Sequence, residues 1–221
     1  MGYEYAQDLR YWYGTGLGTD IEKYQMLPTV DMVLRRFLDG PNAVYTNGNT
    51  SFAPPAISVA FSNDGQINQI LSAIGVFDNE PQLPGNMTIP DRKFRSSRFV
   101  TMRGTVAFER LNCSAAAAPT PSASPAPCSS NSTYANAPKS TGTNSYMRIR
   151  LNDVVYPVAG CTSGPGSSCP LTQYKSIVDQ KLAQAGDFKV LCNDTNPAFT
   201  SQPRSTYFMN NTLPWGIVVK P

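Results

Sequence analysis

The sequence of 221 residues contains no histidine, and only 15% of its residues are charged. Without histidine, the chain cannot form a Ser-His or Cys-His catalytic couple by itself. Lysine and arginine never occur in runs longer than two, so the sequence lacks the basic patch typical of nucleic-acid binding or of a polybasic membrane anchor. No apolar run approaches the ~20 residues that cross a bilayer. We therefore expect neither nucleic-acid nor membrane partners.

Two further kinds of site are not expected. The five cysteines, at positions 113, 128, 161, 169 and 192, do not have the spacing of a zinc site, and neither a metal nor a cofactor is predicted. The glycine-rich stretch GTGLGT at 14–19 lacks a GxGxxG pattern, a Walker lysine and a preceding strand. It is interpreted as a connecting turn.

Cysteines and sequons together favour the secretory pathway. Six Asn-X-Ser/Thr triplets can accept N-linked glycans, at Asn49, Asn86, Asn112, Asn131, Asn193 and Asn210. The alternative is that a composition rich in Asn, Ser and Thr produces such triplets by chance. The N-terminal MGYEYAQDLRYWYG has no basic region followed by an apolar segment, so it is not a signal peptide. We expect a secreted glycoprotein, extracellular or in the cell wall, and a chain that is either processed or part of a longer one.

Hydrophobic periodicity predicts a mixture of helices and strands. Helices are expected over 4–14, over 27–40 with Thr29 as N-cap, from Asp64 to about Gly75, and over 170–183 with Leu171, Tyr174, Ile177, Val178 and Leu182 on one face. Strands are expected at 57–61, 104–111 and 146–151, the last continuing into a hairpin through Asn152-Asp153. Residues 41–55 are predicted to be loop.

A low-complexity stretch divides the chain. Residues 114–145 consist mainly of small residues, Pro and Ser/Thr, and such a composition cannot bury enough apolar surface to offset the entropy of ordering. We expect a disordered insertion there. Residues 1–113 and 146–197 are then two parts of one domain, and 198–221 form a tail.

The segment FSNDGQ, at 61–66, is the candidate site. A strand, a polar turn and a helix in this order present unpaired backbone N–H groups to an anion such as phosphate. Asp64 can act there as a general acid that protonates a leaving-group oxygen. The alternative is structural, because Asp is a preferred helix N-cap. The pattern alone does not decide between them.

Four segments carry a resemblance to a known family: LRYWYGTGLG, FSNDGQINQILSAIGVFD, FVTMRGTVAFERLNC and MRIRLNDVVYPVAGCTSGPGSSCPLTQYKSIV. The sequence resembles the C-terminal half of the histidine acid phosphatases, and most closely the secreted acid phosphatases and phytases of fungi. The resemblance implies an α/β fold, the C-terminal part of a phosphoglycerate-mutase-like mixed sheet with flanking helices. It also implies that this part is incomplete alone.

The resemblance implies roles for particular residues. Asp64 matches the proton donor, and Asn63 takes the position of a family histidine that contacts phosphate. Asn can donate a hydrogen bond but carries no positive charge. The nucleophilic motif Arg-His-Gly-x-Arg-x-Pro is absent, so the N-terminal half of the family is an expected partner and phosphomonoesters are the expected substrates.

The family's disulfides divide between the two halves. The resemblance implies that Cys161 pairs with Cys169, whereas Cys113 and Cys192 match cysteines that pair with the N-terminal half. Cys128 has no counterpart and is an alternative partner for Cys113. Two functions stay open: part of an active secreted acid phosphatase, or a non-catalytic secreted glycoprotein that keeps the fold and at most binds phosphate. Alone, the chain is predicted to be inactive.

Overall fold

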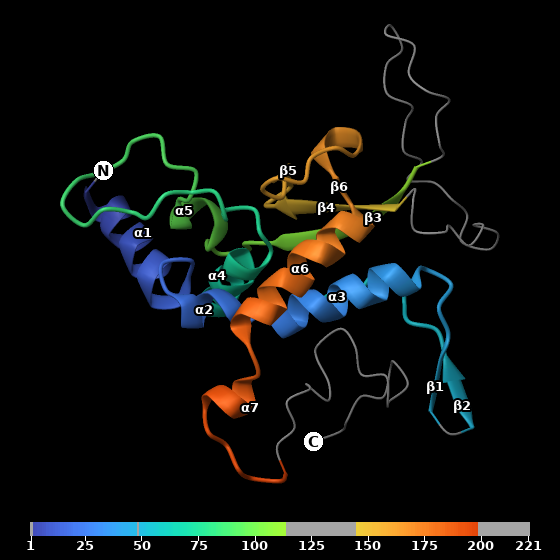
Figure 1. Ribbon diagram of the computed structural model, residues 1–221. Helices are drawn as coiled ribbons and strands as arrows, with labels where there is room; N and C mark the ends of the chain where they lie inside the picture. The colour runs from blue at the N-terminus through green and yellow to red at the C-terminus, as the bar shows by residue number, and fades with distance from the viewer. Residues whose placement is uncertain (1, 48, 114–144, 199–221) are drawn as a thin grey trace, which may run out of the picture.

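The structure, a computed structural model, describes residues 2–47, 49–113 and 145–198 (Figure 1). The helices are α1 (Gly2–Thr15), α2 (Asp20–Tyr24), α3 (Leu27–Asp39), α4 (Asp64–Ala73), α5 (Ser96–Phe99), η2 (Pro165–Ser167), α6 (Leu171–Ala185) and α7 (Phe188–Leu191). The strands are β1 (Tyr45–Asn47), β2 (Thr50–Phe52), β3 (Val106–Asn112), β4 (Ser145–Leu151), β5 (Val154–Val155) and β6 (Cys169–Pro170). Among these helices, none has the length and apolar character that crossing a membrane requires.

The sheet joins the two sides of the low-complexity stretch. Strand β3 pairs with β4 over their whole length, antiparallel, from Val106 opposite Leu151 to Asn112 opposite Ser145. The chain then turns through Asn152 and Asp153, which have φ angles of 46° and 69°. Both angles lie in the left-handed region that two-residue hairpin turns require and that Asn and Asp tolerate. The predicted hairpin is confirmed, since β5 pairs antiparallel with β4.

One face of the sheet forms the core. Burial alternates along β4, with Met147, Ile149 and Leu151 each at most 2% exposed. In register, Phe108 of β3 lies opposite Ile149 and therefore shares this face. Helices α3 and α6 lie side by side across it (Figure 1). Removing each of these β4 side chains from water contributes roughly 1.5–3 kcal/mol, so helices and sheet depend on one another.

The expected α/β class is confirmed, and every strand pair in the described ranges is antiparallel. The long helices also follow the predicted apolar faces. Leu171, Tyr174 and Val178 of α6 are buried. Helix α3 ends at Asp39, and Gly40 caps it with a φ of 87°, which favours glycine. Ser145 corrects the boundary of the expected insertion, because it is the first residue of β4 and fully buried. Residues 114–144 and 199–221 lie outside the described part.

The predicted strand at 57–61 is wrong. The segment has no regular secondary structure, although Ile57, Val59 and Phe61 alternate as strand residues do. Their exposed fractions are 78%, 71% and 89%. A strand is held by hydrogen bonds to a neighbouring strand, and the described sheets offer this segment none. In the same described part, β3 also pairs along one edge only.

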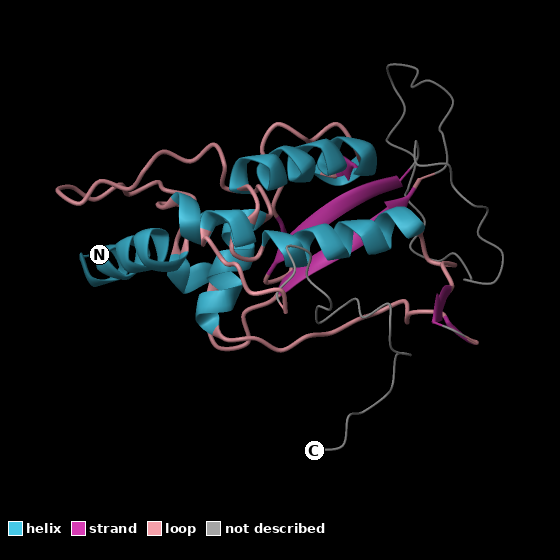
Figure 2. Ribbon diagram, turned by 60° about the horizontal axis from the view of Figure 1, so that its bottom comes forward, coloured by secondary structure: helices cyan, strands magenta, loops and turns pink. Residues whose placement is uncertain are grey.

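Two smaller expectations are also wrong. The predicted loop at 41–55 contains the β1–β2 hairpin, which stands away from the main sheet in both views (Figures 1 and 2). Helix α3 begins at Leu27 with Met26 as N-cap, so Thr29 lies inside its first turn. Pro28 explains the earlier start, because its missing N–H and fixed φ suit the first turn of a helix.

A buried carboxylate fastens the loop before α5 to α1. Asp8 is 0% exposed, and its Oδ1 accepts hydrogen bonds from the backbone N–H and the Oγ of Ser96, each 2.7 Å long. Its Oδ2 accepts from Arg92 Nε at 2.6 Å. The Arg92 guanidinium lies 4.9 Å from the ring centroid of Tyr5. Asp8 thereby replaces its water contacts with three donors, as a buried charge requires.

Substitution of Asp8 with Ala is expected to destabilise the chain by about 3 kcal/mol, because it removes the buried partner of the Arg92 guanidinium. Only Glu4, which is more exposed and lies 3.6 Å from Arg92 Nη2, then remains as a counter-charge. Urea denaturation of the 221-residue chain measures this loss. Asp179→Ala is the matched control. Asp179 pairs with Lys175 at 2.5 Å while half exposed, and we expect a loss under about 1 kcal/mol. Equal losses for the two variants would contradict the structural role of Asp8.

Candidate active site

Helix α4 begins at the candidate site, and Asn63 is its N-cap. Asn63 has an extended backbone, with φ −86° and ψ 171°, and its Oδ1 accepts a 2.8 Å hydrogen bond from the backbone N–H of Gln66. This is the usual way to satisfy an unpaired N–H at a helix start. The cap is therefore Asn63, not Asp64. Asn63 Nδ2 makes no hydrogen bond within the described residues.

Asp64 is the first residue of α4, and its carboxylate is exposed to solvent. Oδ2 accepts a 2.7 Å hydrogen bond from the Tyr11 hydroxyl, and Oδ1 accepts one of 2.9 Å from the Gly65 N–H. These donors, Tyr11 first, lower the pKa of Asp64. The carboxylate is thus more readily ionised in the folded chain. Its ionisation favours folding above the ordinary pKa of Asp, and that contribution is lost as the pH falls through the lowered pKa.

Tyr11 contacts α4 at two points. Besides the hydroxyl bond to Asp64, its backbone carbonyl accepts a 2.8 Å hydrogen bond from Asn68 Nδ2. Asn68 is fully buried and also donates to Thr15 Oγ1 at 2.9 Å. The hydrogen bond to Asp64 and the desolvation of the phenol raise the pKa of Tyr11. The orientation of Asp64 therefore depends on α1.

The opposite end of α4 is held by α6. Tyr174 Oη donates to the Ile74 carbonyl at 3.1 Å, and Lys181 Nζ donates to the Ala73 carbonyl at 3.2 Å. Lys181 also pairs with Asp78, with 2.8 Å between Nζ and Oδ2. Burial lowers the pKa of Lys181 despite this partner. A cation and a hydroxyl at the carbonyl end suit the helix dipole and fix where α4 ends.

The cysteines are distributed as follows. Cys161 and Cys169 form a disulfide with 4.9 Å between their Cα atoms. Cys113 is also disulfide-bonded, and Cys128 lies outside the described residues. Cys192 is free and exposed. The 161–169 disulfide closes the Gly/Pro loop that contains η2 and leads through β6 into α6, so it fixes the entry of that helix.

The sequons differ in their surroundings. Asn49, Asn86 and Asn193 are exposed in turns or bends. Asn112 lies in β3, where its Oδ1 accepts hydrogen bonds from Arg110 at 2.6 Å and from Ser145 at 2.9 Å. Asn131 and Asn210 lie outside the described residues. The structure thus separates three accessible asparagines from one that belongs to the sheet.

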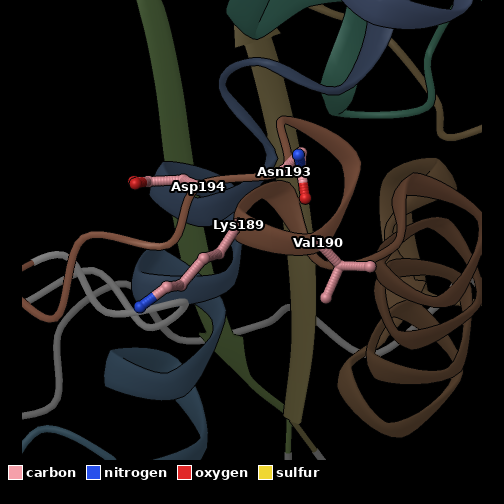
Figure 3. A pocket seen from close by; sticks show the side chains of 4 residues that line it. All are labelled: Lys189, Val190, Asn193 and Asp194. Carbon is pink, nitrogen blue, oxygen red and sulfur yellow. The ribbon is translucent and has the colours of Figure 1, made fainter.

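A surface hollow of about 320 Å³ lies beside α7 (Figure 3). Its lining side chains are Lys189, Val190, Asn193 and Asp194. Lys189 Nζ donates to the Asn196 carbonyl at 3.1 Å, and Asp194 Oδ1 accepts from the Asn196 N–H at 2.9 Å. Both charged side chains therefore hydrogen-bond within the local turn. Helix α4 contributes no lining residue, so the hollow is separate from the candidate site.

Comparison with known proteins identifies the class. A family model of the histidine phosphatase superfamily, branch 2, matches residues 1–152. The chain therefore belongs to this family, as its resemblance to histidine acid phosphatases predicts. The fold agrees: a crystal structure of the phytase from D. castellii superposes with a TM-score of 0.59 at 22% identity, over 92% of this chain and 38% of that one.

Two similar curated proteins come from yeasts. The repressible acid phosphatase of Kluyveromyces lactis is 30% identical over 125 residues, which are 56% of this chain and 21% of that protein. An acid phosphatase of Komagataella pastoris is 27% identical over 188 residues, which are 85% of this chain and 33% of that protein. The chain thus spans at most about a third of the length of these two relatives.

The capping assignment can be tested by stability. Asn63→Ala removes the acceptor of the Gln66 N–H and is expected to destabilise the chain by about 1 kcal/mol. Asp64→Asn keeps an oxygen at the same position and is expected to cost less. Thermal or urea denaturation of both variants measures the difference. A larger loss for Asp64→Asn would show that Asp64 has the main structural role at this helix start.

Proposed function

We propose that this chain carries the proton-donor part of a secreted acid phosphatase that hydrolyses phosphomonoesters. Asp64 is the general acid, and the nucleophilic histidine comes from residues outside these 221. In the reaction, histidine attacks phosphorus, the bond from phosphorus to the leaving oxygen breaks, and Asp64 gives its proton to that oxygen. Water then hydrolyses the phosphohistidine. No metal or cofactor takes part in this scheme.

One observation carries the proposal: Asp64 is not used as the helix cap. Asn63 satisfies the Gln66 N–H, which leaves the Asp64 carboxylate exposed at the positive end of α4. That position suits an anionic phosphate ester, because backbone N–H groups and the helix dipole favour negative charge. An acid placed there lies beside the leaving oxygen of a bound substrate.

Asn63 is proposed as a phosphate contact. Its Oδ1 is engaged in the cap, whereas its Nδ2 has no partner within the described residues. An amide N–H can donate to a phosphate oxygen without adding charge. Phosphate is then held by hydrogen bonds and by the helix dipole, with less electrostatic attraction than a protonated histidine provides.

The exposed 57–61 segment supports the proposal that another part of the protein packs beside the site. Ile57, Val59 and Phe61 present apolar side chains in a segment without regular secondary structure that ends three residues before Asp64. An exposed segment with alternating apolar residues can pair with a strand supplied by another part of the chain. We infer that the histidine-bearing part supplies a strand beside it. Such a strand would bring the nucleophile to the same end of α4 as the acid.

The first experiment is an assay of the chain alone and joined to its upstream sequence. The 221-residue chain is expected not to hydrolyse p-nitrophenyl phosphate between pH 2 and 7, because it has no nucleophilic histidine. The genomic sequence upstream is read for an in-frame Arg-His-Gly-x-Arg-x-Pro motif, and the joined polypeptide is expressed. It is expected to be active, and Asp64→Asn to reduce kcat by about 10²–10⁴-fold.

Two outcomes would contradict the proposal. Hydrolysis by the chain alone would show that the nucleophile lies within these residues. A locus without the motif would favour the second candidate, a non-catalytic secreted glycoprotein that at most binds phosphate. The absence of histidine and the Asn at position 63 are the observations that support this second candidate.

The accessibility of the sequons is tested by glycan mapping. We expect N-linked glycans on the exposed Asn49, Asn86 and Asn193 when the chain passes through the secretory pathway of a yeast host. Asn112 is expected to be unmodified, since its side chain is bonded within the sheet. Enzymatic deglycosylation in ¹⁸O-water followed by mass spectrometry identifies each occupied site. A fully occupied Asn112 beside an empty Asn86 would refute the assignment.

A further inference from the structure

Tyr11 contacts two residues of α4 that are one helical turn apart. Its hydroxyl bonds Asp64 and its carbonyl bonds Asn68, at 2.7 and 2.8 Å. Asp64 and Asn68 are four residues apart and therefore lie on the same helix face. One residue of α1 thus fixes both the position of the first turn of α4 along its axis and its rotation about that axis. A carboxylate held in this way has few alternative rotamers.

The contact needs close approach of the two helices. A Cβ on Gly16 would lie 2.6 Å from the Tyr11 carbonyl oxygen and 3.0 Å from Asn68 Nδ2. The first distance is shorter than real Cβ contacts and the second is tight, so a larger residue at position 16 would crowd the hydrogen bond between the Tyr11 carbonyl and Asn68. Asn68 is fully buried, so water cannot take the place of the Tyr11 carbonyl as acceptor of its amide N–H.

The Tyr11 hydroxyl can hydrogen-bond the Asp64 carboxyl in either of its protonation states. A phenol can donate to a carboxylate and can accept from a protonated carboxyl. Arg10, also on α1, is the charged group that acts on both Asp64 and Tyr11. The other donor to the carboxylate is the Gly65 N–H, which is fixed in the backbone. Tyr11 is therefore the one side chain in the described residues that hydrogen-bonds Asp64.

We propose that Tyr11 is a positioning residue of the phosphatase reaction: it orients the Asp64 carboxyl and stabilises the carboxylate left after Asp64 has given up its proton. This inference rests on the proposed function. The strand-turn-helix pattern around Asp64 does not by itself indicate a role for Tyr11. Stabilising the conjugate base makes Asp64 the stronger acid and narrows the pH range in which it holds a proton.

The test compares Tyr11→Phe with Tyr13→Phe in the 221-residue chain. Tyr13 is on the same helix and its hydroxyl donates to the Leu83 carbonyl at 2.8 Å, so its loss removes a hydrogen bond without touching Asp64. The Asp64 carboxyl carbon is titrated by ¹³C NMR. The pKa of Asp64 is expected to rise in Tyr11→Phe and to be unchanged in Tyr13→Phe. No rise in Tyr11→Phe, or equal rises in both variants, would overturn the proposal.

The joined, active polypeptide provides the second readout. Since the acid must be protonated to act, its ionisation sets the alkaline limb of the rate–pH profile. That limb is expected to move to higher pH in Tyr11→Phe but not in Tyr13→Phe. An unmoved limb, despite a shifted Asp64 titration, would overturn the role of Tyr11 as a positioning residue in the reaction. Absence of any activity would instead refute the proposed function, while the titration still decides whether Tyr11 controls Asp64.

Discussion

The hydrogen bonds at the two ends of α4 determine where the candidate acid lies. Tyr174 and Lys181 of α6 hold the carbonyl end, and Tyr11 of α1 holds the amide end. A ten-residue helix fixed at both ends behaves as a rigid spacer, so Asp64 inherits its position from the α6–sheet core. Loss of either attachment would remove one of the two sets of contacts that hold this helix in place.

Local chemistry allowed much of the fold to be predicted. The apolar faces of α3 and α6, the Gly40 stop and the Asn152-Asp153 turn all depend on residues close in sequence. The same reasoning located Asp64 at a helix start. It did not identify the cap, because Asn63 and Asp64 are both good caps and only the backbone conformation at Asn63 distinguishes them.

The features that could not be predicted are non-local. The alternation in ISVAF is a strand pattern, but a strand also needs a partner, and the described residues provide none. Nothing in the sequence near Tyr11 indicates a hydrogen bond to a residue 53 positions away. Likewise, Lys181 lies on the buried face of α6 without any local sign that it binds the end of α4.

The lowered pKa of Asp64 and its proposed role as a proton donor are consistent once its surroundings are considered. A general acid works when it is protonated, and in this chain water and the Tyr11 hydroxyl both favour the carboxylate. A bound phosphate ester adds negative charge beside it, and a strand packed on Ile57, Val59 and Phe61 would remove water. Both effects disfavour the charged carboxylate and raise its pKa. Under the proposed function, the acid is therefore competent only with substrate and the histidine-bearing part in place, and proton donation is coupled to assembly of the site.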